Sequence, residues 1–156
     1  MLQCEISRGR SGGPGGQNRN KVETKITLVH VPTGVEAHAS ERRSQKENRG
    51  VAIFRLRLAL AREVRTPIAI GEVRTVLWRS RCSGSGHIAC NPLHADYPAL
   101  LALALDVIAA AGWDVKKASL RLCCSMSQLV KLVKDEPHAW VKLNDEREGR
   151  GLRALK

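Results

Sequence analysis

Aromatic residues are scarce in this chain of 156 residues, since tryptophan, tyrosine and phenylalanine together make up 3% of it. Proteins that bind single-stranded nucleic acid by stacking use aromatic side chains as platforms for the bases. The scarcity therefore argues against a binder of that kind. A folded core is still expected, because 43% of the residues are hydrophobic and the length suits one ordinary domain or two small ones.

Long hydrophobic runs are also missing. The longest one covers residues 99–105, far short of the ~20 apolar residues that a membrane helix needs. The N-terminus has no apolar segment of the kind found in secretory signal peptides. We therefore expect a cytoplasmic protein that has no membrane partner.

Acidic residues are few relative to basic ones. The chain has 15 Asp and Glu against 26 Lys and Arg, which gives a formal net charge of +11. Such an excess favours a polyanionic partner, in particular nucleic acid, over a basic protein that is merely soluble. The basic bias is stronger in residues 1–66 than in the rest of the chain.

The five cysteines do not suggest a disulfide framework, because their number is odd and their spacing irregular. Reduced thiols in a reducing compartment fit better. Zinc-ligand residue types do occur close together, at Cys82, His87, Cys90 and His94. Their spacing matches no common zinc motif, so we expect no metal and no cofactor.

A glycine-rich loop is the most unusual feature of the sequence. Residues 12–16 read Gly-Gly-Pro-Gly-Gly, a composition that excludes a core helix or strand. Glycine is used where the backbone takes a positive φ or must approach another molecule closely. The loop is flanked by four basic residues: Arg8, Arg10, Arg19 and Lys21. A bare backbone surrounded by cations is suited to insertion against a polyanion.

Hydrophobic periodicity predicts a small sheet and one long helix around this loop. Alternating patterns predict strands over residues 2–7, 25–31 and 35–40. Residues 41–65 have two apolar stripes at helical spacing, one of which we expect to cover the sheet. The predicted fold class is α+β: a small antiparallel β-sheet packed by one long helix, followed by a small all-helical module.

The chain divides into three parts by composition. We predict a first domain over residues 1–66, a linker with little regular structure over 67–95, and a helical module over 96–156. In that module we expect Pro137 to end a helix, and the charged tail over 142–156 to be a poor helix.

Residues 116–132 have the spacing of a helix-turn-helix motif, in which Ser125 would cap the second helix. Cys123 stands where that motif more often has glycine. A plain helical hairpin fits the pattern equally well, so both interpretations stay open here. In a helix-turn-helix, three residues would face the nucleic acid: Ser127, Gln128 and Lys131.

Residues 8–50 resemble the catalytic domain of class I peptide-chain release factors and of codon-independent ribosome-rescue peptidyl-tRNA hydrolases. A lone Gly-Gly-Gln would be a weak signal, but four motifs occur here in the family's order and spacing. They are Gly15-Gly16-Gln17, Asn20-Lys21, Pro32-Thr33-Gly34 and Ser44-Gln45-x-x-Asn48. The second half more loosely resembles bacterial release-factor-like proteins that join this domain to a helical module.

The resemblance implies that Gly15, Gly16 and Gln17 are the catalytic residues. In the family this loop enters the peptidyl-transferase centre and promotes attack of water on the ester that joins the nascent peptide to tRNA. The backbone N–H of Gln17 would stabilise oxygen charge in the transition state, as in an oxyanion hole. No side chain near the loop resembles a nucleophile or a base, so most of the remaining chemistry would belong to the ribosome.

The expected partners are therefore the ribosome, through its large-subunit rRNA and peptidyl-transferase centre, and peptidyl-tRNA. Off the ribosome we expect a monomer. The basic residues at the start of the long helix could form a merely solvated face, but beside such a loop we favour rRNA contact. The predicted RNA-binding residues are Arg8, Arg10, Arg19, Lys21, Arg42, Arg43, Lys46 and Arg49.

The leading functional hypothesis is hydrolysis of peptidyl-tRNA without codon recognition, in termination or in rescue of stalled ribosomes. We expect no codon reading because the sequence shows no counterpart of the stop-codon-reading domains of release factors. Two alternatives are a ribosome- or RNA-binding factor that keeps the loop but hydrolyses nothing, and a helix-turn-helix regulator.

Overall fold

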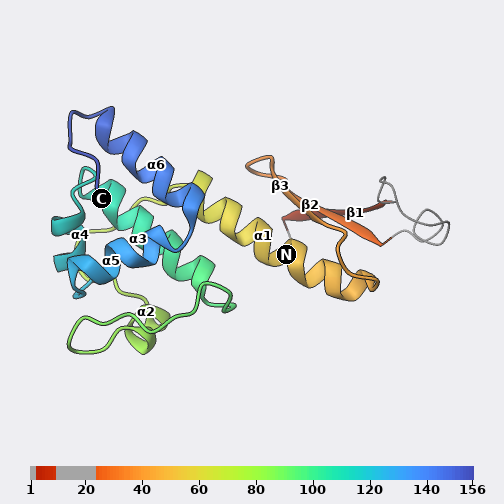
Figure 1. Ribbon diagram of the computed structural model, residues 1–156, viewed down its shortest axis with the longest axis horizontal. Helices are drawn as coiled ribbons and strands as arrows, with labels where there is room; N and C mark the ends of the chain where they lie inside the picture. The colour runs from red at the N-terminus through yellow and green to blue at the C-terminus, as the bar shows by residue number, and fades with distance from the viewer. Residues whose placement is uncertain (1–2, 10–23) are drawn as a thin grey trace. The chain divides into compact units, whose positions relative to one another are not determined.

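The computed structural model describes residues 3–9 and 24–156 (Figure 1). The chain forms two compact units: unit 1, Met1–Glu63, and unit 2, Val64–Lys156. Unit 1 combines a three-stranded antiparallel sheet with one long helix, whereas unit 2 contains only helices and their connections. The predicted α+β fold class is confirmed.

The sheet of unit 1 has the strand order β1-β2-β3. Its strands are β1, Cys4–Gly9, β2, Lys25–His30, and β3, Val35–Ala39, so each predicted strand is present within about two residues. The central strand β2 alternates as a half-buried strand does, with Ile26 and Leu28 only 3% and 1% exposed. These two side chains point toward the helix that covers the sheet.

Helix α1, Gln45–Glu63, covers one face of the sheet, as the sequence predicts. It begins four residues later than predicted, because the backbone bends at residues 41–43 before it. Its end at Glu63 agrees with the helix-breaking effect of Pro67. Five buried residues form the core of unit 1: Ile26, Leu28, Ala39, Ala52 and Leu56.

Unit 2 is built around α3, Tyr97–Ala110, in which nine of the 14 residues are buried. Two buried polar side chains form hydrogen bonds that link segments distant in the sequence within unit 2. The Trp78 indole N–H donates to the Leu122 carbonyl at 2.9 Å, and the Tyr97 hydroxyl donates to the Leu132 carbonyl at 2.8 Å. The helices are α2, Val76–Arg81; α3, Tyr97–Ala110; α4, Val115–Arg121; α5, Met126–Lys134; and α6, Pro137–Glu148.

The stretch over residues 67–95, predicted as a linker, is more regular than the sequence indicated. It contains α2, and Trp78 on this helix is fully buried. After α2 the chain makes a tight turn closed by a β-bridge between Cys82 and Ile88. The burial of an indole ring with a satisfied N–H gives this stretch a fixed place in unit 2.

The prediction for the C-terminal tail is wrong over residues 142–148, which are helical. Helix α5 ends at Lys134, and Pro137 begins α6 rather than ending a helix. Proline is tolerated there because the first residues of a helix have no intrahelical acceptor for their N–H groups. The Glu136 side chain caps α6 by accepting from the Ala139 N–H, and buried Leu143 anchors the helix.

Among the described residues, no single helix is long and apolar enough to cross a membrane. Helices α3 and α4 satisfy the criterion together by length and composition, but they are bent by 119° at the break between them. The apolar character of α3 follows from its position in the core of unit 2.

A buried carboxylate on α3 gives unit 2 a distinctive ionic contact. Asp106 is 8% exposed, and its Oδ1 accepts from the Thr66 N–H at 3.1 Å and lies 3.4 Å from Arg65 Nη1. Burial raises the pKa of Asp106, while the Thr66 hydrogen bond and the Arg65 charge act in the opposite direction. The protonated form of Asp106 is therefore favoured in the folded state relative to the unfolded chain.

We expect the Asp106→Asn variant to lose one component of the pH dependence of unit 2 stability. The pKa of Asp106 is higher in the folded state than in the unfolded chain, so protonation of Asp106 stabilises the folded state. This stabilisation is fully present below the pKa of Asp106 in the unfolded chain. It is lost as the pH rises through the pKa of Asp106 in the folded state. Acidification should therefore improve the stability of the wild type relative to the variant. Urea titrations at several pH values, followed by tryptophan fluorescence, measure this difference, because all three tryptophans lie in unit 2. Parallel pH profiles would contradict the assignment.

Candidate nucleic-acid interface

The connection between β1 and β2 leaves the sheet at one end, where Gly9 pairs with Lys25. Residues 10–23 of this connection lie outside the described residues, so the structure defines where the connection starts and ends. Six of the predicted site residues fall in this stretch: Arg10, Gly15, Gly16, Gln17, Arg19 and Lys21. The other five, on β1 and around the start of α1, are described.

Asn48 joins the end of this connection to the start of α1. Its Nδ2 donates to the Thr24 carbonyl at 2.7 Å and to the Arg42 carbonyl at 2.9 Å. Its Oδ1 accepts from the Arg42 N–H at 2.9 Å. Both donors and the acceptor of the amide are thus used, and the residue is 0% exposed. We call this set of hydrogen bonds the Asn48 clamp.

The clamp explains why asparagine occurs in the first turn of a helix, where its intrinsic propensity is poor. A buried amide with satisfied hydrogen bonds holds three backbone groups that would otherwise lack partners. Thr24 is the last residue before β2, so the clamp fixes the point where the connection rejoins the sheet. Sequence reasoning noted Asn48 as part of a motif but assigned it no role.

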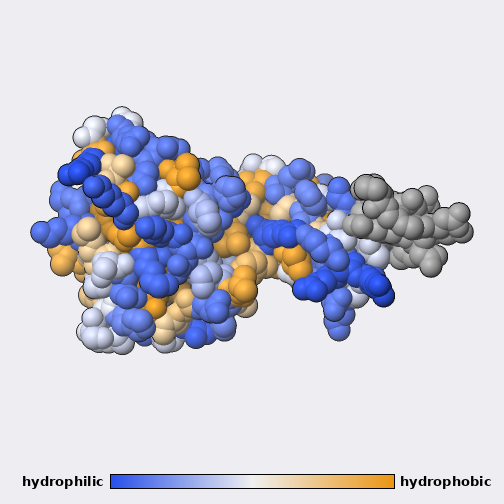
Figure 2. Space-filling view, in the orientation of Figure 1, coloured by the Kyte–Doolittle hydropathy of each residue, from blue (hydrophilic) through white to orange (hydrophobic). Residues whose placement is uncertain are grey.

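Five of the described cations at this end of unit 1 are predicted RNA-binding residues. Arg8 is exposed on β1 opposite Ile26, one residue before the connection. The clamp brings the start of α1 to the same end, together with its exposed basic residues Arg42, Arg43, Lys46 and Arg49. Figure 2 shows strongly hydrophilic residues gathered on the visible face of unit 1. The structure thus places the described RNA-binding candidates around the end of the sheet that carries the connection.

These five cations make no side-chain hydrogen bond or ion pair with any residue that the structure describes. Arg55, further along α1, differs from them. Its Nη1 lies 2.5 Å from Glu41 Oε1 and donates to the His38 carbonyl at 2.9 Å. Two hydrogen bonds hold the pKa of Glu41 below its usual value: the larger effect comes from the Glu41 backbone N–H and the next from the Arg55 side chain. Glu41 therefore remains charged. Arg55 is therefore neutralised within unit 1, whereas the charge of the five cations is not paired with any acidic residue that the structure describes.

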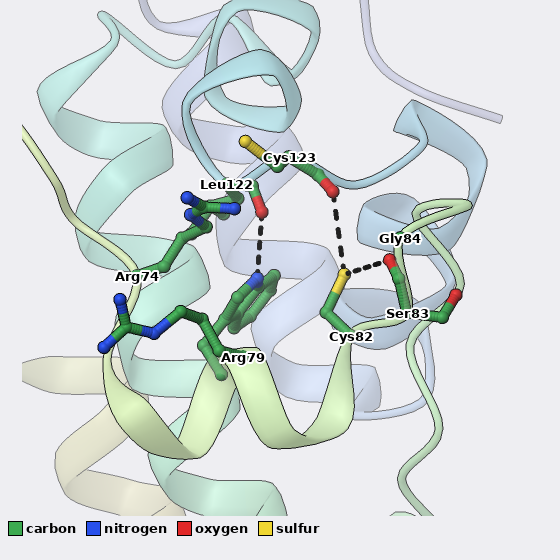
Figure 3. Close-up of a pocket in the computed structure, with 8 residues that line it drawn as sticks. Arg74, Arg79, Cys82, Ser83, Gly84, Leu122 and Cys123 are labelled. Carbon is green, nitrogen blue, oxygen red and sulfur yellow. Dashed lines mark hydrogen bonds between the residues drawn. The ribbon is translucent and has the colours of Figure 1, made fainter.

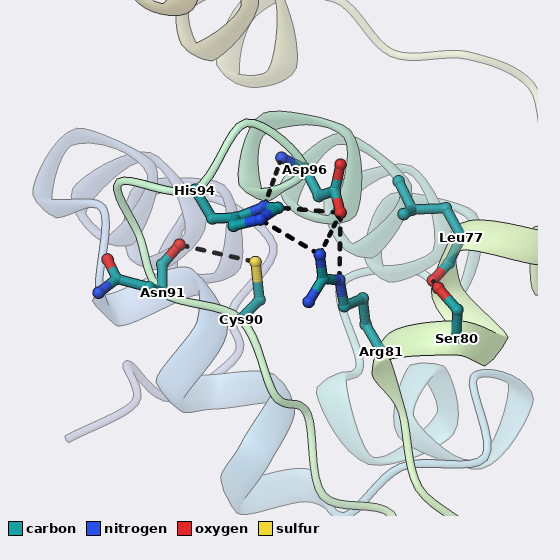
Figure 4. A network of polar contacts seen from close by, with 7 residues as sticks. All are labelled: Leu77, Ser80, Arg81, Cys90, Asn91, His94 and Asp96. Carbon is teal, nitrogen blue, oxygen red and sulfur yellow. Dashed lines mark hydrogen bonds and ion pairs between the residues drawn. The ribbon is translucent and has the colours of Figure 1, made fainter.

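Two of the residues considered as zinc ligands, Cys90 and His94, make other contacts (Figure 4). His94 Nδ1 lies 3.1 Å from the Asp96 backbone N, and Nε2 lies 3.3 Å from Arg81 Nη2. Arg81 also forms a 2.6 Å ion pair with Asp96, and the Cys90 thiol points to the Asn91 carbonyl. The part of the chain that the structure describes has no group of three His, Cys, Asp or Glu residues suited to a metal ion.

The start of α5 is covered by the turn that follows α2. The Ser125 N–H donates to the Gly86 carbonyl at 3.1 Å, and a Cβ at Gly86 would lie only 2.7 Å from the Ser125 nitrogen. Gln128 Oε1 accepts from the Ile88 N–H at 3.3 Å. Of the residues expected to face nucleic acid in a helix-turn-helix, Gln128 thus has a structural contact, which favours the plain helical hairpin. Ser125 caps α5 as predicted, by accepting from the Gln128 N–H.

Comparisons with known proteins agree with the architecture of unit 1. Residues 2–75 match the model of the RF-1 domain. The chain is 44% identical over 72 residues to peptide chain release factor PrfB1, chloroplastic, of Arabidopsis thaliana, covering 45% of this chain and 16% of that protein. It is 53% identical over 51 residues to peptide chain release factor 1 of Chlorobaculum tepidum, covering 33% and 14%.

A third relative is peptide chain release factor 1 of Xylella fastidiosa, 41% identical over 71 residues, covering 46% of this chain and 20% of that protein. The chain thus matches at most a fifth of the length of these three relatives. Residues 2–75 are thus similar to the RF-1 domain of class I peptide-chain release factors, and the match does not extend to the helices α2–α6.

Proposed function

We propose that this protein hydrolyses the ester of peptidyl-tRNA on the ribosome and that it does so without reading a codon. The observation that carries the proposal is the clamped, cationic end of unit 1. There the Asn48 clamp fixes one end of the connection that contains Gly15-Gly16-Gln17, beside five cations that have no ion-pair partner among the described residues. The relatives, all named peptide chain release factors, support peptide release as the activity.

The proposed chemistry uses the loop as a backbone donor. Water attacks the carbonyl carbon of the ester, the carbonyl oxygen gains negative charge, and the ribose oxygen of the tRNA leaves as a hydroxyl. The Gln17 N–H would donate to the charged oxygen, a contact that strengthens as the transition state forms. Gly15 and Gly16 would let the backbone take conformations that residues with side chains avoid.

The cations would act on binding rather than on chemistry. Ribosomal RNA presents a dense array of phosphates, and each contact with a Lys or Arg releases counterions. The exposed residues Arg42, Arg43, Lys46 and Arg49 are suited to this role, because they lie beside the end of the loop. Binding should therefore weaken steeply as the salt concentration rises.

Codon-independent action is the finer part of the proposal. It is motivated by unit 2, an all-helical unit of which only residues 64–75 lie within the family match. We propose that unit 2 helps to deliver the loop to ribosomes and reads no codon. In that case the codon in the ribosomal decoding site should not influence the rate of release.

The test is a release assay with ribosomes that hold labelled peptidyl-tRNA. We expect similar release rates with a stop codon, a sense codon or no codon in the decoding site. A true release factor serves as the positive control for stop-codon dependence. Release only at stop codons would overturn the codon-independent part, and ribosome binding without release in any arm would support the non-catalytic alternative.

A further inference from the structure

Unit 2 contains a cavity of about 290 Å³ that the proposed reaction does not use (Figure 3). It lies between α2 and the turn that joins α4 to α5. Arg74 and Arg79 lie along one side of it, and Cys82, Ser83 and Gly84 along the other. The remaining lining residues are Trp78, Leu122 and Cys123. Its volume is just below the ~300–1,000 Å³ usual for drug-sized ligands, so it suits a small group.

The strongest hydrogen-bond donors that line the cavity are the guanidinium groups of Arg74 and Arg79. Two of the backbone acceptors are already used, because the Leu122 carbonyl accepts from the Trp78 indole and the Cys123 carbonyl lies 3.7 Å from the Cys82 thiol. The formal charge that the lining side chains carry is positive. A site of this kind favours a ligand that accepts hydrogen bonds and carries negative charge.

The two arginines are not equivalent. Arg74 is paired with Glu72, since its Nε and Nη2 donate to the carboxylate at 2.9 Å and 2.6 Å, but Nη1 has no partner among the described residues. The Arg79 guanidinium is exposed and makes no hydrogen bond or ion pair within residues 3–9 and 24–156, although its charge helps to lower the pKa of Glu72. Arg74 is thus paired with Glu72, whereas all the donors of the Arg79 guanidinium are available to a ligand.

We propose that this cavity binds a phosphate group of an RNA strand, with Arg79 as the main ligand and Arg74 Nη1 as the second. A guanidinium presents two parallel N–H donors that match two phosphate oxygens. The inference rests on the proposed function only for the choice of RNA as the source of the phosphate. It would give unit 2 a direct contact with the ribosome, separate from the cations of unit 1.

The binding test uses the full-length chain and a short fluorescent single-stranded RNA at several salt concentrations. We expect Arg79→Ala to bind the RNA about fivefold more weakly than wild type. The slope of log affinity against log salt should also become shallower by about 0.7, because one phosphate contact is lost. Lys116→Ala removes the same charge from an exposed position of unit 2 outside the cavity, so it should change both quantities less. Arg79→Lys, which keeps the charge but loses the paired donors, should fall between wild type and Arg79→Ala.

A second measurement reports on the cavity itself. Cys123 lines the cavity and is exposed, whereas Cys90 lies outside it and serves as the reference thiol. Bound RNA should slow alkylation of Cys123 relative to Cys90 in wild type but not in Arg79→Ala, as measured by peptide mass spectrometry. Equal effects of Arg79→Ala and Lys116→Ala, or RNA binding without protection of Cys123, would overturn the site.

The source of the phosphate is tested with inorganic phosphate and a nucleoside monophosphate in place of RNA. Protection by the monophosphate at the same concentrations as RNA would overturn the assignment to an RNA strand. The assay contains no ribosome and no peptidyl-tRNA, so its outcome is independent of hydrolysis. If RNA protects Cys123 but the release assay fails, the phosphate site in unit 2 is supported and only the proposed hydrolysis is refuted.

Discussion

Replacing Gly16 by alanine is expected to abolish peptide release. Loss of one oxyanion-hole donor costs about 3–4 kcal/mol in known enzymes, which corresponds to a factor of about 10²–10³ in rate. An added Cβ at Gly16 would restrict the backbone that must aim the Gln17 N–H, so the full contribution of that donor would be lost. The measurement is the single-turnover rate of peptide release from ribosomes loaded with labelled peptidyl-tRNA.

Two other variants in the same loop separate this role from a general effect on the loop. Gln17→Ala keeps the backbone N–H and should only weaken release. Gly13→Ala lies outside the Gly-Gly-Gln motif and should have a much smaller effect than Gly16→Ala. All three variants should keep the same affinity for ribosomes, since none removes a cation. Release by Gly16→Ala at the wild-type rate would refute the catalytic assignment.

Asn48→Ala is expected to destabilise unit 1 by about 2–4 kcal/mol. The change leaves the Thr24 carbonyl and both backbone groups of Arg42 without their buried partner, and each buried polar group left unsatisfied costs about 1–3 kcal/mol. The end of the loop would then no longer be fixed to α1, so release should fall as well. Hydrogen exchange of the β2 peptide, followed by mass spectrometry, reports the loss of stability directly.

The neighbouring Glu47→Ala variant is the matched control, because Glu47 is exposed in the same helical turn and should change stability little. Asn48→Asp keeps one acceptor but loses both donors and buries a charge, so it should be at least as harmful as Asn48→Ala. Tryptophan fluorescence, which reports unit 2 alone, provides an internal reference in each variant. Unchanged exchange of β2 in Asn48→Ala would show that the clamp does not hold the sheet.

The sequence was sufficient to predict the architecture of unit 1. Strict alternation defined β3, and the spacing of apolar residues defined α1, because each element has one face in the same small core. The Pro32-Thr33-Gly34 motif forms the turn before β3, with Gly34 at a φ of 69°. Local pattern and tertiary packing favour the same elements here, which is why a single sequence was enough.

Unit 2 was harder to predict because long-range contacts determine parts of it. Trp78 lies in a stretch of weak periodicity, and its place in the core depends on the carbonyl of Leu122, 44 residues away. Pro137 suggested a helix end, but the Glu136 cap and buried Leu143 make it a helix start. Cys123, noted as standing in a glycine position, indeed has a positive φ of 50°.

The candidate site was predictable as a set of residue types but not as an arrangement. Charge density marked the basic residues around the start of α1, and the family motif marked Gly15-Gly16-Gln17. Nothing in the charge pattern showed that Arg8 and the start of α1 share one end of the sheet. That arrangement depends on a hydrogen bond between Asn48 and Thr24, and such pairing of distant residues has no periodic signal in a sequence.

The Asn48 clamp also determines when this domain can mature during its own synthesis. Asn48 follows Thr24 by 24 residues, which at about 5–20 residues per second is a delay of about 1–5 s. Ala52 and Leu56 of the core emerge later still, so β1 and β2 leave the ribosome before the helix that secures them. Nascent chains of this protein thus acquire a secured loop base only after α1 has cleared the exit tunnel.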